Sequence, residues 1–512
     1  MGNKRRYLLY PILFGIYPVF NLIAQNIVEI QLIDVFRTLI ASLIFSLLLY
    51  FLLHKLFKDQ HIAAIFTTLL LIIFFFYGHF YFYFSNNQLF GLDLSRIRYL
   101  IPLNFIILAI GSWLIWKFKN SVKNLTPSLF VISIVLLLFP ISQISQYYWS
   151  QSRNSLTPNS IELASLDDQL LPDIYYIILD GYSRGDVLEN YFDFDNSEFL
   201  QNLEDEDFYI AQCSQANYSW TLPSLSSTLN MIYLNVESES IEIAYSENEM
   251  YALIKNNQVR NILEIFGYEI IAFENGFNWL HWYDADYYLS SIGDEESFLR
   301  LTLGLNSFEL LMLETTALRI LLDINLIENP NQAINFSDIV SNPREIHRQR
   351  INFILDNLPE ISSISREPKF IYAHIVSPHD PYIYGPNGEI LPEDPLNIEQ
   401  AYIDQLNYIN GQIFQVVQQI KNNTDGEAII IIQGDHGAPI EWSESEQNAK
   451  LGILNAIYLP GLDGTKMWHQ SISPVNTFRM IFNQYFGQNF EILPDLSIFG
   501  QSSPSVELPC EN

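Results

Sequence analysis

Five long apolar segments occupy the first 150 residues, and they constrain the fold of this chain more than any other feature. They lie near residues 7–24, 35–53, 62–84, 100–116 and 127–146. Each is long enough to cross a hydrocarbon core of about 30 Å as a helix. Short polar loops separate them, and no small-residue cleavage site follows the first, so they are predicted to be membrane spans rather than a signal peptide or buried helices. We therefore predict a five-helix transmembrane bundle over residues 1–150.

The basic residues predict how this bundle is oriented. One side of the predicted spans holds Lys4, Arg5, Arg6, Lys55, Lys58, Lys117, Lys119 and Lys123. The opposite loops hold Arg96 and Arg98, with Arg37 at a span boundary. Because cytoplasmic loops carry an excess of basic residues, the N-terminus is predicted to be cytoplasmic. After five spans the rest of the chain would lie outside, which predicts a multi-pass protein of the plasma (inner) membrane with an extracytoplasmic domain.

Charge separates the same two parts. Residues 1–150 contain 11 Lys and Arg against 4 Asp and Glu, whereas the remainder contains 15 basic and 53 acidic residues. An acidic outer domain repels polyanions, so no nucleic-acid partner is expected. Residues 151–172 lack apolar periodicity and are predicted to be a linker. Residues 173–512 are long enough for one large α/β domain, in which 298–325 and 346–357 have helical apolar spacing.

Three apolar runs in the outer domain lead directly into Asp or His. They are Ile174–Leu179 before Asp180, Phe370–Ala373 before His374 and His379, and Ala428–Gln433 before Asp435 and His436. Short β-branched runs are typical of parallel strands covered on both faces. Ligands of open α/β sheets gather beyond the carboxyl ends of such strands. Carboxylates and neutral imidazoles suit zinc or manganese, so these strand ends predict a metal site.

A hydroxyl-rich stretch, Asn217–Thr228, follows Asp180 by about forty residues and contains Thr221-Leu222-Pro223-Ser224. With an Asp-ended strand before it and Asp-His-Gly after it, the chain resembles the alkaline phosphatase and sulfatase superfamily, where such an element carries the nucleophile. The resemblance implies that Asp180, Thr221, Asp435 and His436 bind one or two divalent metal ions (Mn, Zn, Mg or Ca). The alternative is that Thr221 and its neighbours only cap a helix.

Thr221 narrows the chemistry that the resemblance implies. Formylglycine sulfatases carry Cys or Ser at this position and Arg two residues after the proline, where this chain has Leu225. Threonine cannot become formylglycine because its Cβ is branched, whereas a metal-activated threonine can attack phosphorus. The chain looks like the membrane-anchored branch, which includes lipoteichoic acid synthases and phosphoethanolamine transferases. That branch implies transfer of a phospho-headgroup through a threonine intermediate, with a membrane lipid or envelope glycan as substrate.

Two further histidines are candidate substrate residues. His379 lies in Pro-His-Asp-Pro-Tyr, which resembles the segment whose histidine contacts the phosphate or sulfate group, so we expect it to donate a hydrogen bond or a proton. His281, before Trp282, is a pocket candidate by the same resemblance, with aromatic packing of that segment as the alternative. His374 is surrounded by apolar strand residues and is interpreted as a structural core histidine.

The resemblance implies an alkaline phosphatase-like domain whose mostly parallel central sheet is sandwiched between helices. It implies a metal-dependent phosphotransferase or ester hydrolase. Two alternatives stay open: a membrane-tethered sulfatase or phosphodiesterase, and a catalytically degenerate scaffold. The two cysteines, Cys213 and Cys510, both fall in the outer domain, where a disulfide can persist, but the sequence does not say whether they pair.

Overall fold

The computed structural model describes residues 7–27, 32–86, 94–153, 171–234, 243, 245–291, 307–320, 343–440, 442–443, 447–462, 464, 468–499 and 510. Its contacts divide the chain into two compact units, which are treated separately below. The first contains Met1–Ser150 and Leu299–Asn342, and the second contains Gln151–Phe298 and Pro343–Asn512. Residues 299–342, which we expected in the α/β domain, therefore belong to the first unit. The predicted linker lies mostly in residues 154–170, outside the described residues.

The first unit is helical. Its elements are η1 (Tyr7–Leu9), α2 (Tyr10–Gln25), α3 (Leu32–Phe57), α4 (Gln60–Asn86), α5 (Ile97–Lys117), α6 (Val122–Arg153) and α13 (Ser307–Thr315). Among the described residues, α3, α4, α5 and α6 are long and apolar enough to cross a membrane. Helix α2 has 16 residues, about 24 Å at a rise of 1.5 Å per residue, which is less than the hydrocarbon thickness. Four spans are thus supported by length and composition, and the predicted fifth is not confirmed.

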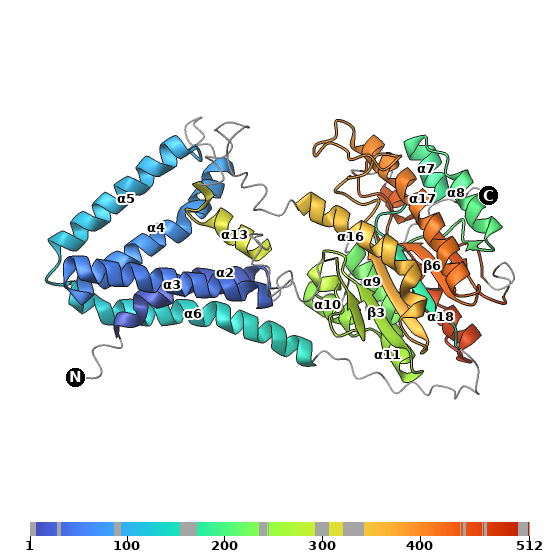
Figure 1. The fold of residues 1–512 in the computed structure, drawn as a ribbon, viewed down its shortest axis with the longest axis horizontal. Helices are drawn as coiled ribbons and strands as arrows, with labels where there is room; N and C mark the ends of the chain where they lie inside the picture. The colour runs from blue at the N-terminus through green and yellow to red at the C-terminus, as the bar shows by residue number, and fades with distance from the viewer. Residues whose placement is uncertain are drawn as a thin grey trace. The chain divides into compact units, whose positions relative to one another are not determined.

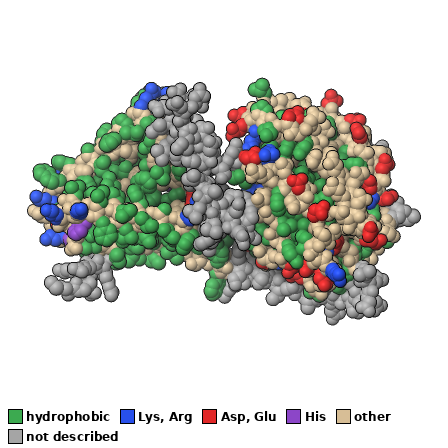
Figure 2. Space-filling view, in the orientation of Figure 1, with side chains coloured by type: hydrophobic (Ala, Val, Ile, Leu, Met, Phe, Trp, Pro, Cys, Tyr) green, Lys and Arg blue, Asp and Glu red, His purple; other side chains and the backbone are tan. Residues whose placement is uncertain are grey.

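Helices α2 and α3 pack at a point where small residues let their backbones approach. The Ser42 hydroxyl donates a hydrogen bond of 2.6 Å to the carbonyl oxygen of Gly15. A Cβ on Gly15 would lie 1.8 Å from Ser46 Oγ, so a larger residue cannot occupy this position. Outward-facing side chains of this unit are mainly hydrophobic, as the green surface in Figure 2 shows. An apolar exterior is what a lipid-facing helix bundle requires.

The second unit is built on a seven-stranded sheet with the order β2-β7-β6-β1-β5-β3-β4. The strands are β1 (Ile174–Leu179), β2 (Tyr209–Ile210), β3 (Glu269–Phe273), β4 (Tyr287–Leu289), β5 (Lys369–Ile375), β6 (Ile429–Gly434) and β7 (Asn455–Tyr458). The pairs β6-β1, β1-β5, β5-β3 and β3-β4 are parallel. The three apolar runs singled out in the sequence therefore become the three central strands.

The expected sheet was mostly parallel, and the observed sheet is mixed: its two antiparallel pairs lie at one edge and both involve β7. Strand β7 pairs antiparallel with both β6 and β2. The chain between β6 and β7 contains the short 3-10 helix η4 (Gln447–Leu451). Parallel neighbours need a crossover that carries the chain back along the sheet. A chain that turns back without such a crossover forms an antiparallel neighbour, which is what happens here.

Alternating side chains of the central strands supply two hydrophobic cores, one on each face of the sheet. In β1, Ile174, Tyr176 and Ile178 enter one core, whereas Tyr175, Ile177 and Leu179 enter the other. The first core is covered by α9 (Thr221–Asn230), α10 (Glu247–Lys255), α11 (Gln258–Ile265) and α18 (Pro474–Tyr485). The second is covered by α7 (Gly185–Phe192), α8 (Ser197–Asp205), α16 (Pro343–Asn357) and α17 (Ile398–Asn423). Figure 1 shows helices on both sides of the strands, as the sequence predicted.

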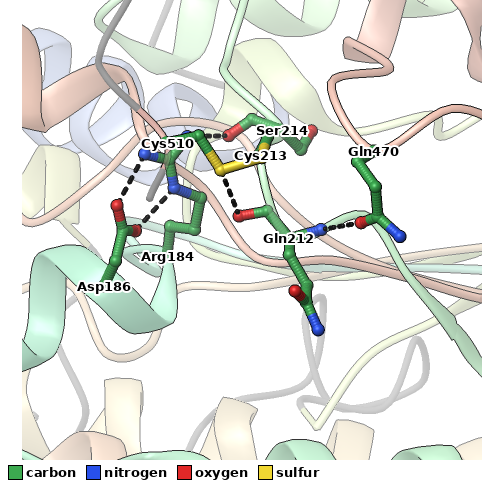
Figure 3. Close-up of a disulfide and its surroundings, with 7 residues drawn as sticks. All are labelled: Arg184, Asp186, Gln212, Cys213, Ser214, Gln470 and Cys510. Atoms are coloured by element: carbon green, nitrogen blue, oxygen red, sulfur yellow. Dashed lines mark hydrogen bonds and ion pairs between the residues drawn. A yellow bond between two sulfur atoms is a disulfide. The ribbon is translucent and has the colours of Figure 1, made fainter. Parts of the chain in front are cut away.

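A disulfide joins Cys213 to Cys510, with their Cα atoms 5.4 Å apart. Figure 3 shows the Arg184 guanidinium beside it, donating to the Asp186 carboxylate at 2.6 and 2.8 Å and to the Ser214 carbonyl. The pairing that the sequence left open is therefore present in the structure. Both cysteines belong to the second unit, so the disulfide makes no covalent link to the membrane helices.

Candidate active site

The candidate site is assembled where three parallel strands end. Strand β1 lies between β5 and β6, and Leu179 is level with Ile375 on one side and Gly434 on the other. Asp180 and Asp435 each follow the last residue of adjacent strands. Their carboxylates must therefore meet at the same edge of the sheet. A Gly follows Asp180 with φ of +74°, a conformation that an L side chain would strain.

Each of these carboxylates has one oxygen held by the protein and one without a partner. Asp435 Oδ1 accepts hydrogen bonds from the backbone N–H of Gly181 (3.1 Å) and of His436 (3.0 Å). Asp180 Oδ2 lies 3.0 Å from His374 Nε2. Within the described part of the chain, Asp180 Oδ1 and Asp435 Oδ2 are buried and have no hydrogen-bond partner. Two unpaired buried carboxylate oxygens are costly unless something positive lies between them.

His436 directs a ring nitrogen toward those two oxygens. Its Nδ1 lies 2.7 Å from the carbonyl oxygen of Gly437, an acceptor, so Nδ1 carries the proton and Nε2 keeps a lone pair. Nε2 lies 3.5 Å from Asp180 Oδ1 and 3.7 Å from Asp435 Oδ2. This backbone hydrogen bond fixes the tautomer that a metal ligand requires.

Thr221 is the first residue of α9, and Trp220 occupies the N-cap position. Its Oγ1 lies 3.3 Å from His436 Nε2. The Ser224 hydroxyl donates a 2.7 Å hydrogen bond to the carbonyl oxygen of Asp435, which ties the first turn of α9 to the Asp-His-Gly loop. The positive end of the helix dipole therefore faces the Thr221 hydroxyl, where it favours negative charge on that oxygen or on a bound anion.

A divalent cation fits this arrangement. The atoms that converge are Asp180 Oδ1, Asp435 Oδ2, His436 Nε2 and Thr221 Oγ1, all of which are potential ligand atoms. Among the described residues, two groups satisfy the distances for holding a metal, Asp180 with His379 and His436, and Asp180 with His374 and Asp435. Carboxylate and imidazole donors suit zinc or manganese. Of the four ligands implied by the resemblance, Asp180, Asp435 and His436 each belong to a candidate metal-binding group, and Thr221 Oγ1 lies 3.3 Å from His436 Nε2.

His379 lies at the rim of this group. Its side chain is 25% exposed, its backbone N–H donates to the carbonyl oxygen of Asp180 at 3.0 Å, and its ring lies 5.9 Å from that of His436. Burial works to lower the pKa of His379, but the Asp180 and Asp380 carboxylates outweigh it and raise the pKa to about 10. A protonated imidazole at the rim can donate to an anion or to a leaving group.

Two residues outside the expected set also lie near the carboxylates. His374 is fully buried and pairs with Asp180, so it is more than a packing residue of β5. The carbonyl oxygen of Lys450 accepts a 2.7 Å hydrogen bond from the backbone N–H of Gly437, which places Lys450 beside the Asp-His-Gly loop. Burial lowers the pKa of the Lys450 amine, and the charges of Asp435 and Asp180 oppose that effect. The signal for His374 was its place in the strand next to β1, level with Ile178 and two residues before the level of Asp180. The signal for Lys450 was its place in residues 441–450, where the resembled family often supplies a further His or Lys.

His281 is not brought into this group. Its Nε2 accepts hydrogen bonds from the backbone N–H of Asn275 (3.3 Å) and of Gly276 (3.2 Å), and its Nδ1 lies 2.6 Å from the Tyr283 hydroxyl. Its neighbour Trp282 stacks on Tyr372 with ring centroids 4.2 Å apart. Both ring nitrogens of His281 are therefore engaged inside the protein, which favours the structural alternative for this segment.

These observations define an α/β domain that gathers Asp, His and Thr at the carboxyl ends of its central strands. The family model described as Sulfatase matches residues 172–473, more than half of the chain, and the chain belongs to the sulfatase family. The resemblance identified from the sequence is thereby confirmed. No curated protein sequence matches the chain.

Solved structures with a similar fold include both membrane and excised forms. The integral membrane lipooligosaccharide phosphoethanolamine transferase A from Neisseria meningitidis is 11% identical, with 93% of this chain and 94% of that chain covered and a TM-score of 0.40. The C-terminal periplasmic domain of EptC from Escherichia coli, in complex with Zn, is 11% identical over 63% and 85% of the two chains, with a TM-score of 0.39. The lipoteichoic acid synthase LtaP from Listeria monocytogenes is 12% identical over 65% and 77%, with a TM-score of 0.36.

Proposed function

We propose that the protein is a membrane-bound, metal-dependent phosphotransferase that moves a phospho-headgroup from a lipid phosphodiester to an acceptor through a covalent intermediate on Thr221. The observation that carries this proposal is the convergence of Thr221 Oγ1 with His436 Nε2 and the unpaired oxygens of Asp180 and Asp435. Catalytic roles follow from these positions: Thr221 is the nucleophile, and Asp180, Thr221, Asp435 and His436 are the metal ligands.

Asp180, Thr221, Asp435 and His436 would hold a divalent ion, which when bound would lower the pKa of the Thr221 hydroxyl and neutralise charge on the phosphate. In the first half of the reaction the Thr221 hydroxyl loses its proton to solvent, and Oγ1 forms a bond to phosphorus. The bond from phosphorus to the lipid alcohol breaks, and His379 gives its proton to the departing alkoxide. The N-terminus of α9 stabilises charge on the phosphate oxygens during this step.

In the second half the intermediate on Thr221 is resolved by a hydroxyl. His379, now neutral, takes the proton of an acceptor hydroxyl or of water as that oxygen attacks phosphorus. The phosphorus–Oγ1 bond then breaks, and Oγ1 takes a proton from solvent, which restores the Thr221 hydroxyl. His374 acts as a positioning residue, because its hydrogen bond to Asp180 Oδ2 leaves Oδ1 directed at the site. Lys450 adds positive charge on the side of the two carboxylates.

Membrane placement supports a lipid substrate and transfer over simple hydrolysis. The helices α3, α4, α5 and α6 are long and apolar enough to span a bilayer. Under the orientation expected from the basic residues, the α/β unit lies outside the plasma (inner) membrane, where headgroups and envelope glycans are within reach. The acceptor is then a hydroxyl of an envelope lipid or glycan.

The proposal is tested with the purified full-length protein in mixed micelles that contain a phosphodiester lipid with a fluorescent acyl chain. Release of the fluorescent lipid alcohol measures the first half of the reaction, and intact mass measurement detects the covalent adduct on Thr221. The matched pair Thr221→Ser and Thr221→Val tests whether the reaction needs the hydroxyl of this side chain or only its shape. Serine keeps a hydroxyl, whereas valine keeps the branched Cβ. We expect an adduct in the parent protein and in Thr221→Ser, and none in Thr221→Val.

Parallel assays distinguish the two alternatives. If Thr221→Val still hydrolysed p-nitrophenyl sulfate, the protein would be a tethered sulfatase and Thr221 would not be its nucleophile. Lipid alcohol released without transfer to any hydroxyl acceptor would support a phosphodiesterase. Absence of both bound metal and turnover would support the degenerate scaffold.

A further inference from the structure

Helix α13 (Ser307–Thr315) is the part of the chain whose location is least explained by the proposed function. In the sequence it lies between β4 (Tyr287–Leu289) and α16 (Pro343–Asn357), both elements of the α/β unit. In the structure the segment Leu299–Asn342 belongs instead to the first unit, with the membrane helices. Figure 1 shows α13 beside α4. The chain therefore leaves the α/β unit, contributes a helix to the bundle and returns.

One face of α13 is buried among apolar side chains of three helices of the first unit, α2, α3 and α4. Phe308 and Met312 are 2% and 8% exposed, and their spacing of four residues places them on the same face. They join a cluster with side chains of α2, α3 and α4: Val19, Leu22, Ile23, Val35, Leu71 and Phe75. These residues lie near the end of α2, near the start of α3 and in the middle of α4, and together they form the surface on which α13 docks.

Polar contacts fix α13 on this surface. Arg37 on α3 donates to both carboxylate oxygens of Glu309, from Nε at 2.8 Å and from a terminal nitrogen at 2.6 Å. The backbone N–H of Ala317 donates to the carbonyl oxygen of Phe74 in α4 at 2.8 Å. A two-point guanidinium–carboxylate pair specifies orientation as well as proximity. A backbone hydrogen bond to a membrane helix also satisfies a group that lipid would leave unpaired.

The backbone of α4 is shaped for this contact. A Cβ on Gly78 would lie 2.2 Å from the carbonyl oxygen of Glu314 and 2.5 Å from Cα of Thr315. Only glycine admits the C-terminal end of α13 at this distance. One helical turn further along α4, the Tyr81 ring lies 3.6 Å from the Arg319 guanidinium carbon. Three kinds of contact thus hold α13 against the bundle: an apolar face, an ion pair and a close approach of two backbones.

We propose that α13 is a second membrane anchor of the α/β domain, and that its partner is the surface formed by α2, α3 and α4 of the same chain. The basic residues place the end of α2 and the start of α3 outside the cytoplasm. The α/β domain then remains attached to the bundle through α13 even when its connection to α6 is cut. This inference does not depend on the chemistry proposed for Thr221.

The test cuts that connection and asks what stays bound. A recognition sequence for a specific protease is inserted between Ala164 and Ser165 of the full-length protein, which carries an affinity tag at its N-terminus. After cleavage in mild detergent the N-terminal fragment is captured through the tag. We expect the C-terminal fragment to be captured with it, because the Cys213–Cys510 disulfide lies entirely within that fragment and every remaining link is non-covalent.

Variants assign the retention to α13. Phe308→Glu with Met312→Glu places two charges on the buried face and is expected to reduce co-capture at least about tenfold. Leu318→Glu is the matched control, since Leu318 is 42% exposed, and co-capture should match that of the parent. Release of the C-terminal fragment from the unmodified parent would overturn the proposal, as would full retention in the double variant.

A second measurement is independent of how well the charged variant folds. In the cleavable protein, Arg37→Cys is combined with Glu309→Cys, and a bis-maleimide long enough to replace the two parent side chains is added before cleavage. A cross-link between these positions joins the two fragments on a denaturing gel, as expected from the contact between the ends of the parent side chains. The single variants should give no joined band, and absence of the band in the double variant contradicts the docking of α13.

Discussion

Two histidine-bearing clusters of the α/β unit differ in which of their atoms lack a partner. In the first, His436 Nε2 and the free oxygens of Asp180 and Asp435 are acceptors that face one another. In the second, beyond β3, both ring nitrogens of His281 are engaged by its neighbours. Among the described residues, the unpaired side-chain atoms there include the donors Asn275 Nδ2 and Trp282 Nε1 and the Tyr288 hydroxyl, and none of them is a carboxylate oxygen or an imidazole nitrogen.

The comparison separates a site from a structural network more sharply than residue type does. Both clusters are buried and both contain histidine, so composition alone treats them alike. Burial of facing acceptors destabilises the fold unless a cation binds between them, whereas a satisfied network stabilises it. Changes in the first cluster should therefore reduce activity more than stability, and changes at His281 should do the reverse.

Removal of the Thr221 hydroxyl is expected to have the largest effect. Thr221→Val should lower turnover of the lipid phosphodiester by about 10⁴-fold or more, because no other group forms the covalent bond. The melting temperature should stay close to that of the parent, since the branched Cβ is kept. Steady-state kinetics of one preparation measure the turnover, and thermal unfolding of the same preparation measures the melting temperature. Activity within tenfold of the parent would show that Thr221 is not the nucleophile.

Loss of one carboxylate ligand should be next in size. Asp435→Asn keeps the shape of the side chain and an acceptor oxygen for the backbone N–H groups of Gly181 and His436, but it removes a charge from the metal-binding group. Metal affinity is expected to fall by at least about 100-fold, and activity should return partly at high metal concentration. Metal content after dialysis and a titration of activity with Mn²⁺ or Zn²⁺ measure this. Unchanged metal content in the variant would exclude Asp435 as a ligand.

His379→Gln should have a smaller effect that depends on the leaving group. Release of a lipid alcohol needs a proton, so its rate should fall by about 10²–10³-fold. The p-nitrophenolate of bis-p-nitrophenyl phosphate leaves without a proton, and the first turnover of that ester should change much less. Single-turnover measurements with the two esters make the comparison. Equal losses for both would assign His379 to phosphate binding rather than to proton transfer.

The strand ends of the first cluster could be predicted because their signals are local. Runs such as Ile429–Gln433 identify buried strands, and parallel strands must bring Asp180 and Asp435 to one edge. The direction of β7 could not be predicted, because it depends on how the chain returns after β6. His374 was assigned to the core alone, since a buried strand position looks the same whether its side chain packs or pairs with Asp180.

The location of α13 shows the same limit at a larger scale. Apolar spacing over residues 298–325 predicts an amphipathic helix, and part of that segment is helical. Periodicity does not say which apolar surface the helix covers. The surface that α13 covers is set by its contacts with Gly78 and Arg37, more than 200 residues earlier in the chain. Nothing in the local sequence of either residue indicates these contacts.

His281 should give the smallest effect, and one of opposite kind. His281→Phe keeps a ring in the packed segment but leaves the backbone N–H groups of Asn275 and Gly276 without their acceptor. A loss of about 1–2 kcal/mol in stability is expected at pH 7.5, because the buried N–H of Asn275 becomes unpaired and the N–H of Gly276, an exposed residue, loses its acceptor. Turnover by the remaining folded protein should match that of the parent. A loss of activity without a loss of stability would return His281 to the substrate site.

The pH dependence of that stability difference is a further check. Burial, with Arg350 and Lys255 nearby, lowers the pKa of His281 to about 3, whereas in the unfolded chain it is about 6.5. Since the folded-state pKa is the lower one, the stabilisation is fully present above pH 6.5. It is lost as the pH falls below 6.5, by about 1.4 kcal/mol per unit until the pH approaches 3.

The gap in melting temperature between parent and His281→Phe should therefore narrow from pH 7.5 to pH 5.5. His347, whose pKa burial also lowers, to about 4, is common to both proteins and does not affect the difference. A gap that widens on acidification would mean that His281 is charged in the folded protein, and the contrast between the two clusters would fail.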